Sequence, residues 1–148
     1  MSLKTWKEEF YPTPADKFRS PDSGISLGRL TKADKLEAAQ HSLQKWRGLR
    51  QPALARHNVR IMDVDALCGT TCAAGIEDIQ TREVFSIMAD TCSLCVMHVG
   101  RCWWCPLNKR TSGCNTAHDA PYGIFCWNGD PEPMIAALEA TAAELEKD

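Results

Sequence analysis

Apolar side chains recur at three- and four-residue steps in two parts of the chain, and this spacing predicts two long helices. The first covers residues 32–47, with Thr31 as its N-cap, Asp34 completing a capping box and Gly48 ending it. Its predicted inward face consists of Leu36, Ala39, Leu43, Trp46 and Leu49. His41 lies off this stripe, so we expect its side chain to be exposed.

The second helix is predicted at the C-terminal end, within residues 130–147. Asp130 is the expected N-cap, Pro131 the first helical residue and Glu132 a first-turn acid, with the helix running to about Glu146. Its predicted inward residues are Ile135, Leu138, Ala142 and Leu145.

Other segments give weaker signals. Closely spaced prolines and glycines predict an extended N-terminal arm over residues 1–29, anchored by aromatic side chains. Pro52 favours the start of a short helix that Asn58 ends in a left-handed conformation. Residues 59–64 and 82–88 predict strands of a small antiparallel sheet, whereas the glycine-containing segment between them predicts no strand.

The predicted fold class is α+β: an N-terminal arm and helix, a small antiparallel sheet, a zinc-knuckle cluster, and a C-terminal helix packed on the same core. Its 148 residues suit a single domain. The expected segments are an arm (1–29), a helical region (30–58), a β region (59–91), a cysteine-rich region (92–128) and the C-terminal helix (130–147).

Charge and hydropathy narrow the function classes. The net charge of −2 argues against a dedicated nucleic-acid-binding protein. The charged N-terminus does not resemble a signal peptide, and no apolar run approaches the ~18 residues that a membrane helix needs. We therefore expect a cytoplasmic protein, in which clustered thiols stay reduced and serve as ligands or catalysts more often than as disulfides.

The strongest chemical signal is a cluster of five cysteines, the candidate metal ligands. They are Cys92, Cys95, Cys102, Cys105 and Cys114. Two C-x2-C pairs supply the four thiolates of a closed tetrahedral zinc site, which has no open position for water and is therefore structural. An iron–sulfur cluster is the rival, although the compact C-x2-C-x2-C run of ferredoxins is absent.

Five thiols for four positions leave the ligand set open. Both pairs can bind with Cys114 left over, or the first pair can bind together with Cys114 and either Cys102 or Cys105. The six residues between the pairs form a tight link, which slightly favours a set that includes Cys114. His98 and His118 are possible substitutes for a sulfur, although a single loop histidine usually faces solvent.

The remaining cysteines carry weaker predictions. Cys68 and Cys72 form a C-x3-C pair without a nearby second pair, so buried structural cysteine is the simpler interpretation. Cys126 stands between Phe125 and Trp127 and is expected to be buried.

Two binding functions are further alternatives. Cations and stackable rings gather on the second cysteine pair, as on single-strand nucleic-acid platforms: Arg101, Trp103, Trp104, Lys109 and Arg110. The basic residues Lys35, Lys45, Arg47 and Arg50 are candidate phosphate contacts for a captured small nucleotide.

The order of several motifs resembles a family of small cysteine-rich bacteriophage- and prophage-encoded proteins that has no established activity. These motifs are HSLQKWRGL, ADTCSLC, C-x2-C-P-L, Cys114, the Pro121–Tyr122 dipeptide and GDPEPMIAALE. The resemblance covers roughly residues 6–146 and implies a phage origin. It supports the ligand cluster without naming a reaction.

The sequence contains no H-E-x-x-H motif, no phosphate loop and no H-x-E…P-C-x-x-C deaminase pattern. We therefore expect a non-catalytic protein with structural zinc that acts by binding a host or phage protein partner.

Overall fold

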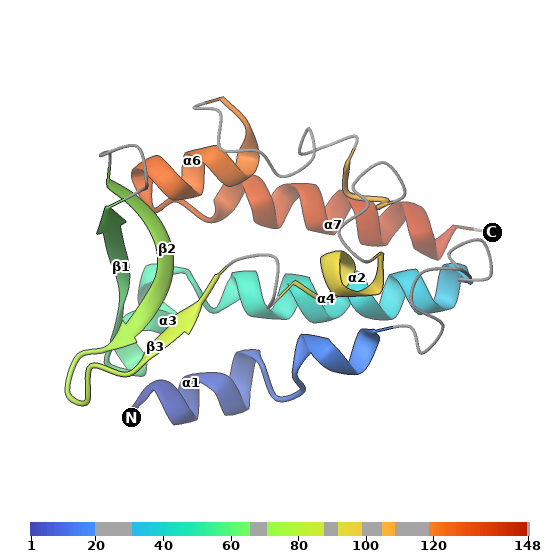
Figure 1. Ribbon diagram of the computed structural model, residues 1–148. Helices are drawn as coiled ribbons and strands as arrows, with labels where there is room; N and C mark the ends of the chain where they lie inside the picture. Colours follow the sequence, from blue (N-terminus) through green and yellow to red (C-terminus); the bar gives the residue numbers. More distant parts are fainter. Residues whose placement is uncertain (20–30, 66–70, 88–91, 99–104, 109–118, 148) are drawn as a thin grey trace.

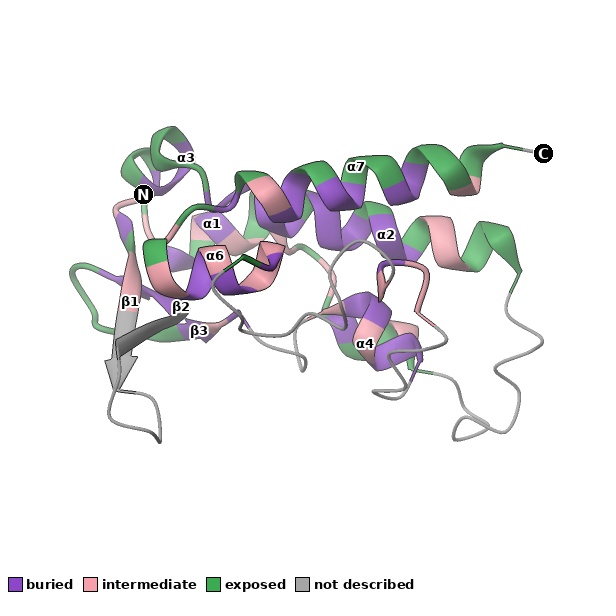
Figure 2. Ribbon diagram, turned by 90° about the horizontal axis from the view of Figure 1, so that it is seen from above, coloured by how far each residue is buried: buried purple, intermediate pink, exposed green. Residues whose placement is uncertain are grey.

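Two long helices form the centre of the molecule, as the apolar spacing predicts. The computed structural model describes residues 1–19, 31–65, 71–87, 92–98, 105–108 and 119–147. Helix α2 spans Lys32–Arg47 and helix α7 spans Glu132–Glu146. They pack side by side in opposite directions (Figure 1), and their facing sides are buried (Figure 2).

The ends of these helices follow the sequence closely. The Thr31 hydroxyl accepts a hydrogen bond from the Asp34 backbone N–H at 3.1 Å, and the Asp34 carboxylate accepts one from the Thr31 N–H at 3.0 Å. This confirms the predicted capping box. Helix α7 begins one residue later than predicted, with Pro131 in the N-cap place. The Asp130 carboxylate nevertheless accepts a hydrogen bond from the Glu132 N–H at 3.0 Å.

The predicted extended arm is wrong over its first part, where helix α1 spans Leu3–Phe10. Ser2 caps this helix through a capping box, and the first proline comes only at position 12, so nothing interrupts the turns before it. Leu3 and Trp6 are fully buried, so the helix is held by an apolar stripe as well as by its cap. A short 3₁₀ helix, η1 (Ala15–Phe18), follows.

A three-stranded antiparallel sheet in the order β1-β2-β3 lies at one end of the helices (Figure 1). The strands are β1 (Val59–Asp65), β2 (Thr71–Asp78) and β3 (Val84–Ser86). Helix α3 (Gln51–Arg56) leads into β1, and Asn58 between them has φ 55°, which confirms the predicted left-handed residue.

Strand β2 lies where no strand was predicted. Its sequence, TCAAGIED, has few β-branched residues and a central glycine, so its alternation signal is weak. The glycine is needed for packing, because a Cβ on Gly75 would approach the Phe85 carbonyl oxygen to 2.6 Å. Pairing with a strand on each side, rather than intrinsic preference, places this segment in the sheet.

Two further helices lie in the part predicted to be a metal-binding loop. Helix α4 (Ser93–Met97) packs against α2 and η1, and helix α6 (Pro121–Asn128) packs against α7 and β2. The aromatic and glycine residues of α6 have low helix propensity, so the sequence does not indicate this helix. Burial of Phe125 stabilises the helix, and Gly129 ends it at φ 70°.

One buried cluster joins these elements, and it includes side chains from α1, α2, the sheet, α4, α6 and α7. At its edge Phe10 lies against Gly48, where a Cβ would come within 2.5 Å of the phenyl ring. The fold class is therefore α+β, as predicted. In the described part of the chain, no helix is long and apolar enough to cross a bilayer.

Candidate metal centre

The first cysteine pair lies at the start of helix α4. Cys92 is the N-cap residue and Cys95 stands one turn later, so the two sulfurs leave the same side of a single helical turn. Both residues are intermediate in exposure. A C-x2-C pair on one turn presents two sulfurs to a common ligand, which is the local geometry that a tetrahedral thiolate site uses.

The Cys92 sulfur is surrounded by groups that favour its ionised form. The pKa of the Cys92 thiol is held well below its ordinary value, chiefly by a hydrogen bond with the Cys95 side chain. The positive charge of Lys45 and hydrogen bonds from the Cys95 backbone and the Ser42 side chain lower this pKa further, whereas burial raises it. The Ser42 Oγ lies 3.6 Å from the Cys92 Sγ. A thiolate is the form of cysteine that binds metal.

The other predicted ligands are only partly placed. Cys105 is half-buried and packs against the core, whereas Cys102 and Cys114 lie outside the described residues. Among the residues that the structure describes, no three His, Cys, Asp or Glu side chains form a group that could hold a metal. Cys126 is buried, as predicted. Cys68 lies outside the described residues, and Cys72 is in β2.

A second buried stripe on α2, beside the predicted apolar one, lies against this cysteine pair. Ala38, His41, Ser42 and Lys45 follow helical spacing and are all buried, although three of them are polar. The expectation that His41 is exposed is wrong, because its side chain is 8% exposed. Helix α4 and the N-terminal segment cover this face, which sequence spacing alone does not show.

His98, expected to face solvent, is instead 1% exposed. Its Nδ1 lies 2.7 Å from the Leu94 carbonyl, so Nδ1 carries the hydrogen and the lone pair is on Nε2. Among the described residues, Nε2 of His98 is buried without a hydrogen-bond partner, and so is Nδ1 of His41. In His41 it is Nε2 that donates, to the Thr13 carbonyl at 2.5 Å. Each ring therefore has its tautomer fixed by one hydrogen bond, while burial favours the neutral form and lowers the pKa of both histidines.

Acid is expected to destabilise the fold through these two histidines. Burial lowers the pKa of both rings below the ordinary value, so the unfolded chain binds protons near pH 6.5 where the folded chain does not. Their contribution is complete above that pH and is lost below it, by at most about 1.4 kcal/mol per pH unit for each histidine. Urea unfolding at pH 7.5 and 5.5 measures the loss.

The matched variants are His98→Asn and His41→Gln, because each amide nitrogen replaces the ring nitrogen that donates. Each variant should lose less stability between the two pH values than the unaltered chain does. An unchanged acid dependence in both variants would show that other groups cause it.

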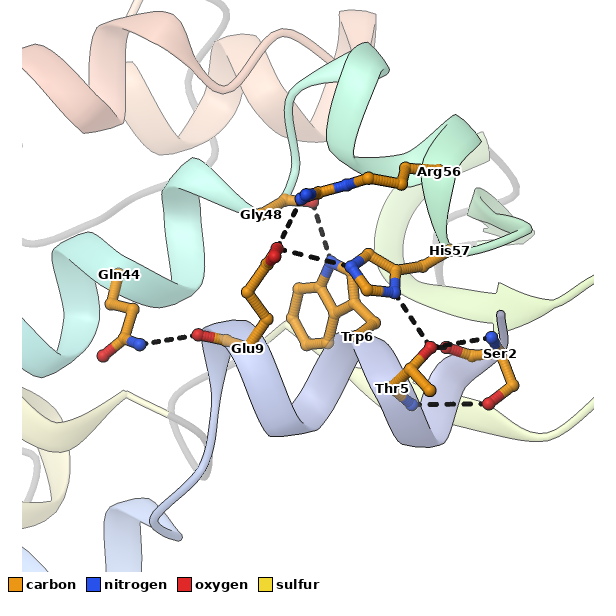
Figure 3. A network of polar contacts seen from close by, with 8 residues as sticks. All are labelled: Ser2, Thr5, Trp6, Glu9, Gln44, Gly48, Arg56 and His57. Carbon is orange, nitrogen blue, oxygen red and sulfur yellow. Dashed lines mark hydrogen bonds and ion pairs between the residues drawn. The ribbon is translucent and has the colours of Figure 1, made fainter.

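A second polar network joins α1 to the end of α3 (Figure 3). The Thr5 Oγ1 lies 2.9 Å from Nδ1 of His57, whose Nε2 lies 3.3 Å from the Glu9 carboxylate, and Arg56 also contacts that carboxylate. The Trp6 indole N–H donates to the Gly48 carbonyl at 2.8 Å in the same region. No sequence motif indicates this network, because its members come from two distant segments.

The order hydroxyl, imidazole, carboxylate is that of a nucleophile activated by a base. In this network, however, the Thr5 hydroxyl donates to the Ser2 carbonyl at 2.8 Å and accepts from the Ser2 N–H at 2.8 Å. Its single hydrogen is used in the helix cap, and His57 is almost fully buried. The arrangement therefore fixes helix α1 to α3.

A surface hollow of about 450 Å³ lies on the other side of α1. It is lined by Lys4, Lys7, Glu8, Tyr11, Pro12 and Glu83. Its two lysines and two glutamates offset each other, so the hollow does not select an ion of either sign.

The structure describes the predicted phosphate contacts for a nucleotide but not the predicted nucleic-acid contacts. Arg101, Trp103, Trp104, Lys109 and Arg110 lie outside the described residues.

Of the predicted phosphate contacts, Arg50 forms a two-bond ion pair with Glu132 and Arg47 lies 3.6 Å from Glu139. Lys45 is completely buried. These three residues therefore do not form an open cationic surface.

Comparison of the chain with protein-family models, curated proteins and solved structures found no match.

Proposed function

We propose that Cys92 and Cys95 form one half of a structural zinc site, completed by sulfurs from among Cys102, Cys105 and Cys114. The observation that supports this most is the environment of Cys92, where hydrogen bonds with Cys95 and the positive charge of the buried Lys45 favour a thiolate.

We propose further that the protein acts without catalysis, by binding a protein partner in the cytoplasm, which is the host cytoplasm if the chain is phage-encoded. A closed four-sulfur site has no position for a reacting water. The hydroxyl–imidazole–carboxylate network has its hydroxyl engaged in a helix cap. These features support a structural rather than a chemical use of both polar centres.

The test is metal analysis of the full chain purified without chelator, combined with titration of reactive thiols. We expect about one zinc per chain, lost in Cys92→Ser and Cys95→Ser and kept in Cys126→Ala, which alters a buried cysteine outside the cluster. Iron with visible absorbance would assign the site to an iron–sulfur cluster instead.

A chain with neither metal nor reactive thiols would contradict the proposal. Partner binding is tested separately with the zinc-loaded chain as bait in host lysate. If the chain binds single-stranded RNA or DNA with an affinity that falls steeply as salt is raised, the region of the second cysteine pair would be assigned to nucleic-acid binding instead.

A further inference from the structure

Lys45 is a lysine without solvent exposure, at 0%. It lies in the last turn of α2, on the face that α4 covers, and its ammonium is 5.9 Å from the centre of the Trp46 ring. Removing an ammonium from water costs far more than burying an apolar side chain of the same size, unless negative charge or hydrogen-bond acceptors compensate it. Such a residue therefore needs hydrogen-bond acceptors or negative charge around its ammonium inside the protein.

The neighbours of Lys45 on α2 lie against the Cys92 sulfur, whose ionised form is one source of negative charge near the ammonium. Ser42 stands one turn before Lys45, and its hydroxyl lies 3.6 Å from the Cys92 sulfur and 2.9 Å from the Ser93 hydroxyl. The Ser93 hydroxyl in turn donates to the Ala38 carbonyl at 2.6 Å. These contacts bind the first turn of α4 to the polar stripe of α2, so the sulfur and the ammonium belong to one buried polar region.

A zinc ion with four thiolate ligands carries a net charge of about −2, and with three thiolates and one neutral ligand about −1. Such a centre next to a hydrophobic core is stable only if nearby positive charge and N–H or O–H donors compensate it. Lys45 supplies the positive charge, and a compact ammonium does so without acting as a ligand.

We propose that Lys45 is a positioning residue of the zinc site, whose buried ammonium compensates the charge of the zinc–thiolate centre and raises its affinity for zinc. The inference rests on the proposed zinc site. It explains why a lysine is fully buried in the last turn of α2, on the stripe that also carries Ala38, His41 and Ser42.

The experiment measures the zinc affinity of the full chain by competition with a chromophoric chelator under reducing conditions. Lys45→Met, which keeps the length of the side chain, should lower the affinity by about tenfold or more, because the anionic centre loses its counter-charge. Lys45→Arg should restore most of it. Lys32→Met is the matched control, since it removes an exposed lysine from the same helix and should change nothing.

Cobalt substitution gives a readout that packing alone would not change. A nearby positive charge stabilises the sulfur lone pairs, so the thiolate-to-cobalt charge-transfer band should move to longer wavelength in Lys45→Met and return in Lys45→Arg.

A folded Lys45→Met protein with unchanged zinc affinity and cobalt spectrum would overturn the inference while leaving the zinc site in place. An unaltered chain that binds no zinc would instead remove the proposed function. If Lys45→Met does not fold, Lys45→Gln carries the same comparison. If only Lys45→Arg folds and its zinc affinity is high, the result would support a requirement for positive charge at position 45. If none of the methionine, glutamine and arginine variants folds, Lys45 would have a packing role and the inference would be overturned.

Discussion

Removal of zinc by a strong chelator is expected to unfold the cysteine-rich part of the chain, over residues 92–128. Structural zinc contributes about 10–16 kcal/mol in zinc-finger peptides, which is comparable to the ~5–15 kcal/mol that stabilises a whole domain. Helix α4 has five residues and is far too short to persist by itself. Without zinc, the cysteine sulfurs would lose the cation that links their segments to one another.

Hydrogen exchange and circular dichroism, before and after chelation and after zinc is returned, would follow this unfolding. Amides of α4 and α6 should lose protection with the metal and recover when zinc is restored. Calcium- and magnesium-selective chelators are the control and should have no effect. Full retention of protection in metal-free protein would show that apolar packing alone holds this region, and zinc would then lose its structural role.

Replacing Trp6 with alanine should cost about 3–5 kcal/mol of stability, the usual range for a buried aromatic residue. Trp6 is 0% exposed, and its ring lies 5.7 Å from that of Phe10 and 5.4 Å from that of Phe85. The substitution also leaves the Gly48 carbonyl without its indole donor, a loss of about 1–3 kcal/mol if no water replaces it. Denaturant unfolding measures the total.

Trp6→Phe separates the two contributions, since it keeps an aromatic ring and removes the N–H. We expect a cost between those of the alanine variant and of Lys4→Ala, an exposed change on the same helix that should be nearly neutral. A Trp6→Ala cost below about 1 kcal/mol would mean that α1 contributes little to the core.

The two long helices were predictable because their apolar spacing, caps and terminators agree with one another. The N-terminal helix was not predicted because the prolines from Pro12 onward favour an extended chain, and this preference was extended to the residues before them. Ser2 and the spacing of Leu3 and Trp6 nevertheless indicate a capped amphipathic helix. Strand β2 and helix α6 were missed for another reason: their own residues favour these structures weakly, and the surrounding sheet and core decide them.

The candidate site divides in a similar way. The proximity of Cys92 and Cys95 could be predicted from their spacing, because a pair on one turn is a local feature. The burial of the polar side chains beside this pair could not be predicted, since His41, Ser42 and Lys45 have the pattern of the solvent-facing side of an amphipathic helix. Only the packing of α4 and the N-terminal segment across α2 shows that this side is buried.

The contact of Phe10 with Gly48 restricts how this sequence can vary. Any side chain at position 48 would occupy the space of the phenyl ring, while the Gly48 carbonyl must stay in place to receive the Trp6 indole N–H. A larger residue at 48 is therefore tolerable only together with a smaller one at 10. Positions 10 and 48, which are 38 residues apart, are therefore expected to change together in evolution, although each lies at the end of a different helix.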